Sequence, residues 1–215
     1  DSTPIRLPQW AVFGTLDVGP GGEVYAIGAE YNTSPDFIVT RSSNAQAGGA
    51  ISFDASTRLT LGSMRLGNEF LNPVGLMGQA NIAVDRSNGP RRGWGYVLCS
   101  ADPTGTDPLN IMFSRSTDGG LTFSPAVRVN DDPPGANAYQ WFGTMAVAPN
   151  GRIDVIWNDT RHASNPNQPT TTELYYSFSN DGGVTWAPNE QLGPAWNPLV
   201  GHPVIGHLVA HRAGH

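Results

Sequence analysis

Two aspartates with matching neighbours stand 63 residues apart and are the first candidates for chemistry. Each lies in the pattern Ser-x-Asp-Gly-Gly-x-Thr, followed by an aromatic residue. A carboxylate at the start of a tight turn accepts hydrogen bonds from the backbone N–H groups that follow it, and glycine adopts turn conformations that cost other residues energy. We therefore expect these carboxylates to hold turns and not to act in catalysis. The positions concerned are Ser116, Asp118, Gly120, Thr122, Phe123, Ser179, Asp181, Gly183, Thr185 and Trp186.

A second constellation consists of four histidines near the C-terminal end, His202, His207, His211 and His215. The last three recur every four residues, which on a helix would gather them on one face for a metal ion. The repeat described below instead places His207 and His211 in a strand, where four residues span about 13 Å. We therefore predict no metal site and no cofactor.

The composition narrows the class of protein and the kind of partner. All 12 basic residues are arginine, which suits the recognition of carboxylates, and 18 acidic residues bring the net charge to −6. This balance argues against nucleic acid as a partner, and no apolar stretch is long enough for membrane insertion. Gly (26 residues) and Pro (18) are frequent and only 14% of residues are charged, which is typical of all-β proteins with many short strands.

The 63-residue period organises the elements that must position these side chains. Each unit begins with an apolar run and a tight turn, continues through a second strand, a polar loop and a third strand, and then reaches the aspartate turn and a fourth strand. Expected first strands are 12–18, 81–84 and 141–148; second strands 23–29, 94–100 and 152–158; third strands 37–42, 111–116 and 174–179; fourth strands 123–129 and 186–192.

Four antiparallel strands joined as a meander form one blade of a β-propeller. The sequence therefore predicts an all-β fold in which residues 1–215 are a single partial propeller. The blades are expected at 9–74, 75–138 and 139–199, and the first strand of a fourth blade at 200–215. In the first blade the turn is degenerate, because Asn44 takes the place of the aspartate and Phe53 that of the aromatic residue.

The pattern Ser-x-Asp-x-Gly-x-Thr-Trp/Phe resembles the Asp-box, or BNR repeat, of the sialidase (neuraminidase) superfamily. Residues 151–161 and the box that follows also resemble bacterial secreted sialidase-like proteins. The resemblance implies a six-bladed propeller, a secreted or extracytoplasmic location at the cell surface or in the periplasm, and a glycan or glycoconjugate as partner. If the chain is active, it implies a retaining exo-glycosidase, namely an exo-α-sialidase that uses no cofactor.

Sialidases grip the substrate carboxylate with arginines and use a Tyr–Glu nucleophile pair and an Asp acid/base. The segment Ile5-Arg6-Leu7-Pro8 resembles the family's Arg-Ile-Pro motif, so the resemblance makes Arg6 a carboxylate-binding candidate. Glu30 matches the Glu of a family Glu-x-Arg motif, but the arginine is absent. The acid/base position falls near Asn32, which cannot transfer a proton in that role.

Three further residues are candidates for substrate binding. Tyr31 could stack on a sugar, Asp36 lies close to the expected acid/base position, and Arg161 follows the second strand of the third blade. The other arginines and the Tyr–Glu pair of the family belong to later blades, which this sequence does not contain. The alternatives are therefore a non-catalytic glycan- or protein-binding module and a structural repeat domain of a larger surface protein.

Three blades alone would leave unpaired strands at both ends, which favours aggregation. We expect either that the sequence is a piece of a longer chain or that two copies form a homodimer that completes six blades around a two-fold axis.

Overall fold

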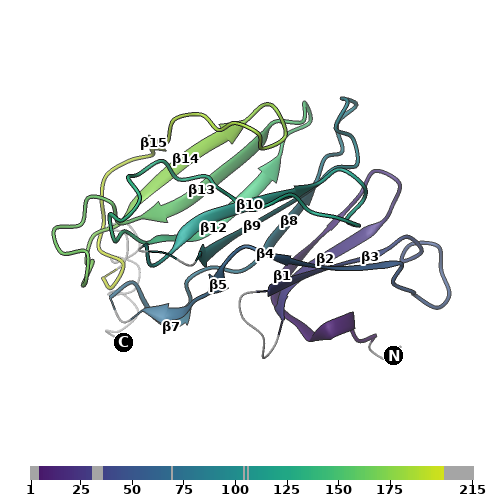
Figure 1. Ribbon diagram of the computed structural model, residues 1–215, viewed down its shortest axis with the longest axis horizontal. Coiled ribbons are helices and arrows are strands. Elements are labelled where there is room, and N and C mark those ends of the chain that lie inside the picture. The colour runs from purple at the N-terminus through teal and green to yellow at the C-terminus, as the bar shows by residue number, and fades with distance from the viewer. Residues whose placement is uncertain (1–4, 31–35, 69, 104, 106, 201–215) are drawn as a thin grey trace, which may run out of the picture.

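The computed structural model describes residues 5–30, 36–68, 70–103, 105 and 107–200, and it confirms the all-β prediction. Three antiparallel sheets lie side by side (Figure 1). The first holds β1 (Ala11–Val18), β2 (Val24–Glu30), β3 (Asp36–Ser42) and β4 (Ala55–Thr60). The second holds β8 (Asn81–Val84), β9 (Gly95–Asp102), β10 (Asn110–Ser116) and β11 (Val127–Arg128). The third holds β12 (Gln140–Val147), β13 (Ile153–Asp159), β14 (Glu173–Ser179) and β15 (Glu190–Gln191).

The connection between the first two sheets is more elaborate than the sequence predicts. In this connection the short strand β5 (Ser63–Met64) pairs with β9, and β6 (Leu66–Asn68) pairs with β7 (Asn72–Leu76). A 3-10 turn, η1 (Pro8–Trp10), lies before the first sheet and leads into β1. The four-stranded meanders lie within residues 9–74, 75–138 and 139–199, whereas β5 precedes residue 75 but joins the second sheet, and β7 crosses from residue 74 to residue 75. Residues 201–215, with the four histidines and nearly all of the predicted fourth blade, lie outside the described residues.

The core lies between neighbouring sheets, because each strand turns alternate side chains to opposite faces. One cluster joins the first and second sheets around Phe37 and Val97, and another joins the second and third around Phe113 and Trp157. The side chain of Cys99 is fully buried in the first cluster, and burial raises the pKa of its thiol to about 12. The middle sheet is therefore covered on both faces by its neighbours.

Two fourth strands are shorter than predicted. The sequence indicates strands over 123–129 and 186–192, but β11 and β15 each contain two residues. Pro125 and Pro188 stand at equivalent positions two residues after the aromatic residue of each turn. Proline has no N–H to donate to a ladder, so pairing is interrupted there.

The two aspartate turns, 116–123 and 179–186, are held by the same set of hydrogen bonds, and we call them the Asp-box turns. Oδ1 of Asp118 accepts from the Ser116 hydroxyl (2.7 Å) and from the backbone N–H of Thr122 (2.9 Å), and Oδ2 accepts from the Thr122 hydroxyl (2.6 Å). The equivalent bonds surround Asp181. In the first sheet, Oδ1 of Asn44 takes over part of this role and accepts from the Ser42 hydroxyl.

Each Asp-box turn also contacts the sheet that precedes it. The guanidinium of Arg41, at the end of β3, donates to the carbonyl of Gly119 at 2.7 Å. Arg115 holds the same place in the second sheet and donates to the carbonyl of Gly182 at 3.4 Å. The Asp-box turns therefore join neighbouring sheets as well as closing their own.

The Asp-box carboxylates make stability depend on pH in the acid range. The hydroxyl and backbone N–H of Thr122 lower the pKa of Asp118 to about 2. Burial alone would raise the pKa of Asp181, but the hydroxyl and N–H of Thr185 lower it to about 2. Because these values lie below the unfolded value of about 3.9, the stabilisation is present above that pH and is lost as the pH falls through about 2.

We therefore expect the thermal unfolding midpoint to fall between about pH 4 and pH 2, and to fall less in the double variant Asp118→Asn/Asp181→Asn. Scanning calorimetry of both proteins across this range measures the difference. Equal pH dependence of the two proteins would show that these carboxylates do not supply the acid-sensitive stabilisation.

Candidate functional site

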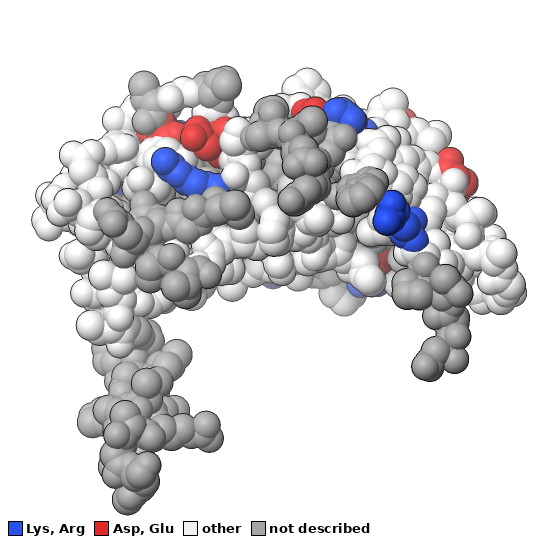
Figure 2. Space-filling view, turned by 90° about the horizontal axis from the view of Figure 1, so that it is seen from below, with Lys and Arg blue, Asp and Glu red and all other residues white. Residues whose placement is uncertain are grey.

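The direction of the strands places the predicted binding residues on one edge of the sheets. We call this the entry edge, because the first strand of each sheet begins there. The chain returns to it at the end of the second strand, so Ala11 pairs with Glu30 and Gln140 pairs with Asp159. The Asp-box turns follow the third strand and therefore lie at the opposite edge. Viewed from below in Figure 2, the described residues form a shallow arch.

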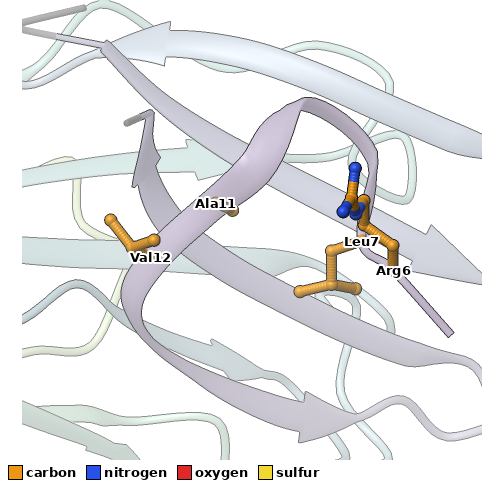
Figure 3. Close-up of a pocket in the computed structure, with 4 residues that line it drawn as sticks. All are labelled: Arg6, Leu7, Ala11 and Val12. Atoms are coloured by element: carbon orange, nitrogen blue, oxygen red, sulfur yellow. The ribbon is translucent and has the colours of Figure 1, made fainter. Parts of the chain in front are cut away.

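Arg6 lies beside an open hollow of about 200 Å³ at the entry edge. The hollow is lined by Arg6, Leu7, Ala11 and Val12, and Figure 3 shows the guanidinium beside the turn that leads into β1. Arg6 itself is exposed. The position thus combines a permanent positive charge with an apolar lining.

Of the other first-sheet candidates, the structure places the backbone of Glu30 and the side chain of Asp36 at the same edge. Glu30 is the last residue of β2, and Tyr31 lies outside the described residues together with Asn32. Asp36 begins β3, where its carboxylate accepts from the Thr60 hydroxyl at 2.7 Å and pairs with Arg58 at 3.2 Å. The carboxylate of Asp36 is thus used in pairing with the neighbouring strand β4.

Arg161 stands in a network of acidic groups between the second and third sheets. Its guanidinium donates to Asp159 (2.8 Å), Asp131 (2.8 Å) and Asn189 (3.0 Å). It also lies over the ring of Tyr175, 4.1 Å from the centroid. The side chain of Asp159 has no exposed surface and that of Arg161 is 12% exposed. The geometry is that of an ion-paired arginine, and substrate binding by Arg161 stays a prediction.

The charges in this network shift one another's pKa values. Burial alone would lower the pKa of Arg161, but its hydrogen bond to Asp159 and the charge of that carboxylate raise it above the ordinary value. Burial raises the pKa of Asp132, which lies 3.8 Å from the Arg161 guanidinium. The arginine is therefore permanently charged, and its positive charge balances buried negative charge.

The pairing register of the first two strands aligns the first sheet with the third, a match that the 63-residue period does not show. Since Ala11 corresponds to Gln140, the segment Glu30-Tyr31-Asn32 of the first sheet corresponds to Asp159-Thr160-Arg161 of the third. The acidic-x-Arg arrangement that the first blade lacks is thus present in the third. An offset of 129 residues between the outer units is the sequence signal that reveals it.

Sequence reasoning missed two exposed phenylalanines at the entry edge. Phe13 and Phe142 occupy equivalent bulges in β1 and β12, where the pairing register shifts. Both have positive φ, 56° and 52°, a conformation that costs a residue of this kind of order 1–3 kcal/mol. The two residues are 46% and 42% exposed. The signal was available as the tripeptide Phe-Gly-Thr, which occurs twice, 129 residues apart.

Within the described ranges, no three His, Cys, Asp or Glu side chains gather in a way that could hold a metal ion. In the same part of the chain, no helix is long and apolar enough to span a bilayer.

Known structures share this fold over most of the chain. The α-L-arabinanase of Penicillium chrysogenum, solved with arabinobiose, matches 88% of the chain with a TM-score of 0.55 and 16% identity. The GH93 α-L-arabinofuranosidase of Fusarium graminearum, also with arabinobiose, matches 86% with a TM-score of 0.54 and 15% identity. A PL25 ulvan lyase bound to -[GlcA(1-4)Rha3S]- matches 84% with a TM-score of 0.51 and 13% identity.

The matched region covers only part of each of these proteins. The chain spans 51% of the arabinanase, 48% of the arabinofuranosidase and 37% of the lyase. No protein-family model and no curated protein matches the sequence. The three sheets therefore have the propeller fold of carbohydrate-active enzymes and correspond to about half of the first two.

Proposed function

We propose that this chain is part of a glycan-binding propeller whose ligand lies at the entry edge and includes an acidic sugar. The observation that carries the proposal is the hollow at Arg6, where a guanidinium stands beside the apolar side chains of Leu7, Ala11 and Val12. A guanidinium binds a carboxylate through two parallel hydrogen bonds, and an apolar lining accepts the C–H groups of a sugar ring.

The propeller fold supports this proposal, because structures that share it were solved with bound arabinobiose or with an acidic oligosaccharide. Hydrolysis is the finer proposal: a retaining exo-sialidase in which Arg6 holds the substrate carboxylate. The remaining catalytic groups would come from further blades, supplied by a longer chain or by a second copy. The alternative is a non-catalytic glycan- or protein-binding module, favoured by Asn32 at the acid/base position.

Binding of sialyllactose and of lactose tests the proposal, because the two differ only in the acidic sugar. We expect Arg6→Met to weaken sialyllactose binding about tenfold or more, which is about 1.4 kcal/mol, and to leave lactose binding unchanged. Calorimetric titration measures both affinities, and Arg86→Met, at the opposite edge, serves as the control for loss of an exposed arginine.

Equal affinity of the wild type for the two sugars would contradict a carboxylate site at Arg6. A fluorogenic sialoside and a 4-nitrophenyl arabinofuranoside then separate the enzyme from the binding module. Turnover of either substrate establishes hydrolysis. Binding without turnover by the assembly that includes the further blades establishes the binding module.

A further inference from the structure

The two strained phenylalanines have a feature that packing does not explain. A positive φ in a bulky residue is an outlier, and such outliers persist where the surrounding structure imposes them, often at ligand-binding sites. Phe13 and Phe142 repeat the same outlier in two sheets. In both, the ring that the strained backbone carries remains nearly half exposed instead of entering the core.

Phe13 and Phe142 lie in the first and third sheets, each of which packs against the second sheet. The first sheet has the second sheet after it, and Phe13 is still 46% exposed. The third sheet has the second sheet before it, and Phe142 is still 42% exposed. Each ring therefore stays accessible although one adjacent sheet is already in place.

The segment 77–80 of the second sheet bridges the two bulges. The backbone N–H of Ala80 donates to the carbonyl of Phe13 at 3.3 Å, and the N–H of Phe142 donates to the carbonyl of Met77 at 2.7 Å. Two residues separate these contacts, so the two phenylalanine backbones lie within about 16 Å of each other. The exposed residue Gln79 lies between them, at the position of the second sheet that corresponds to Phe13 in the first and Phe142 in the third.

The bridge is held by hydrogen bonds of Asn81 and Thr15, and the ring of Phe142 meets the buried ring of Trp141 edge-on, with the centroids 5.4 Å apart. The Asn81 amide donates to the carbonyl of Gln79 at 2.9 Å and to that of Gly143 at 3.0 Å. The Thr15 hydroxyl donates to the carbonyl of Ala80 at 3.1 Å. Hydrogen bonds thus tie the segment 77–81 to both β1 and β12 at the entry edge.

We propose that Phe13, Gln79 and Phe142 form a saccharide-binding row in which the two rings stack on two sugar residues of one oligosaccharide. The proposal rests on the glycan function proposed above and adds a site distinct from the hollow at Arg6. The face of a phenyl ring carries partial negative charge and accepts the C–H face of a sugar, while the amide of Gln79 bonds to hydroxyl groups. A rigid, exposed aromatic ring fits such stacking because little conformational freedom is lost on binding.

The variants Phe13→Gly and Phe142→Gly test this inference, because glycine adopts a positive φ without strain. Titration with lactose and with sialyllactose is expected to show roughly tenfold weaker binding of both sugars in each variant. The thermal unfolding midpoint is expected to stay within about 3 °C of the wild type. Phe142→Trp should retain binding, and Leu121→Ala, at the opposite edge, is the matched control for loss of an exposed apolar side chain.

Nuclear magnetic resonance gives a direct measure of stacking. Protons of a bound sugar that lie over a phenyl face should shift upfield in the wild type and return toward their free positions in the glycine variants. If the wild type binds lactose and both glycine variants bind it equally well, the inference is overturned while the proposed function stands. If the wild type binds neither sugar, the proposed function fails and the inference fails with it.

Discussion

Replacement of Arg161 by alanine is expected to lower the free energy of unfolding by about 3–5 kcal/mol, because it leaves buried carboxylates without a counter-charge. Asp159 has no exposed side-chain surface, and it accepts two of its hydrogen bonds from the guanidinium and the backbone N–H of Arg161. The same arginine bonds to Asp131 and Asn189 and so connects the second and third sheets. Chemical denaturation of the wild type and the variant measures the loss.

The matched control is Arg86→Ala, which removes an arginine that also pairs with an aspartate but is 56% exposed. Its expected effect is below about 1 kcal/mol, since water screens an exposed pair. Arg161→Lys should recover part of the stability, because it restores the charge without the planar fork. Unchanged stability in Arg161→Ala, combined with lost binding of sialyllactose, would instead identify Arg161 as a ligand-binding residue.

Gly14→Ala is expected to destabilise the protein by about 3 kcal/mol or more, which for a chain of this size lowers the unfolding midpoint by roughly 6–12 °C. A Cβ at position 14 would lie 1.6 Å from the carbonyl oxygen of Ile27 and 2.9 Å from the Cα of Gly28. Both obstacles are backbone atoms of the adjacent strand, so β1 must move away from β2. The bulge that presents Phe13 therefore depends on the glycine that follows it.

Gly95→Ala is the control for this substitution. Gly95 also lies in a strand and, unlike the exposed Gly14, is buried, but the nearest atom to an added Cβ there is the Cβ of Ser116 at 4.0 Å. We expect no loss of stability, because alanine fits without contact strain and restricts the unfolded chain. Differential scanning calorimetry compares the two, and similar midpoints for the two variants would refute the steric argument.

The architecture could be predicted from the sequence because two repeated patterns, the Asp-box turn and the apolar run of the first strand, recur with the same period. The landmarks at Asp118 and Asp181 fix where third strands end, and the apolar runs at 81–84 and 141–148 fix where first strands lie. The lengths of β11 and β15 were overestimated, since Pro125 and Pro188 interrupt pairing. The hairpin of β6 and β7 lacks any counterpart in the other units, so no repeat indicated it.

The site was harder to predict because its residues are defined by backbone conformation. Positive φ at Phe13 and Phe142 follows from bulges in the pairing of β1 with β2 and of β12 with β13, and the apolar pattern of these strands does not mark where the register shifts. Arg161 was recognised as a charged residue near a loop, but its partners Asp131 and Asn189 come from other segments. The sequence therefore predicted that these residues lie at the entry edge, but it did not predict which side chains contact one another there.

The contacts of Arg41 with Gly119 and of Arg115 with Gly182 have a direction along the chain. In each pair the arginine precedes the turn that it holds, so it has already left the ribosome when that turn is synthesised. A newly made blade thus finds its anchor on a blade that is already present, and domains emerge from translation with the N-terminal part first. Assembly of the arch can therefore proceed one blade at a time during synthesis, each addition covering the apolar face left by the last.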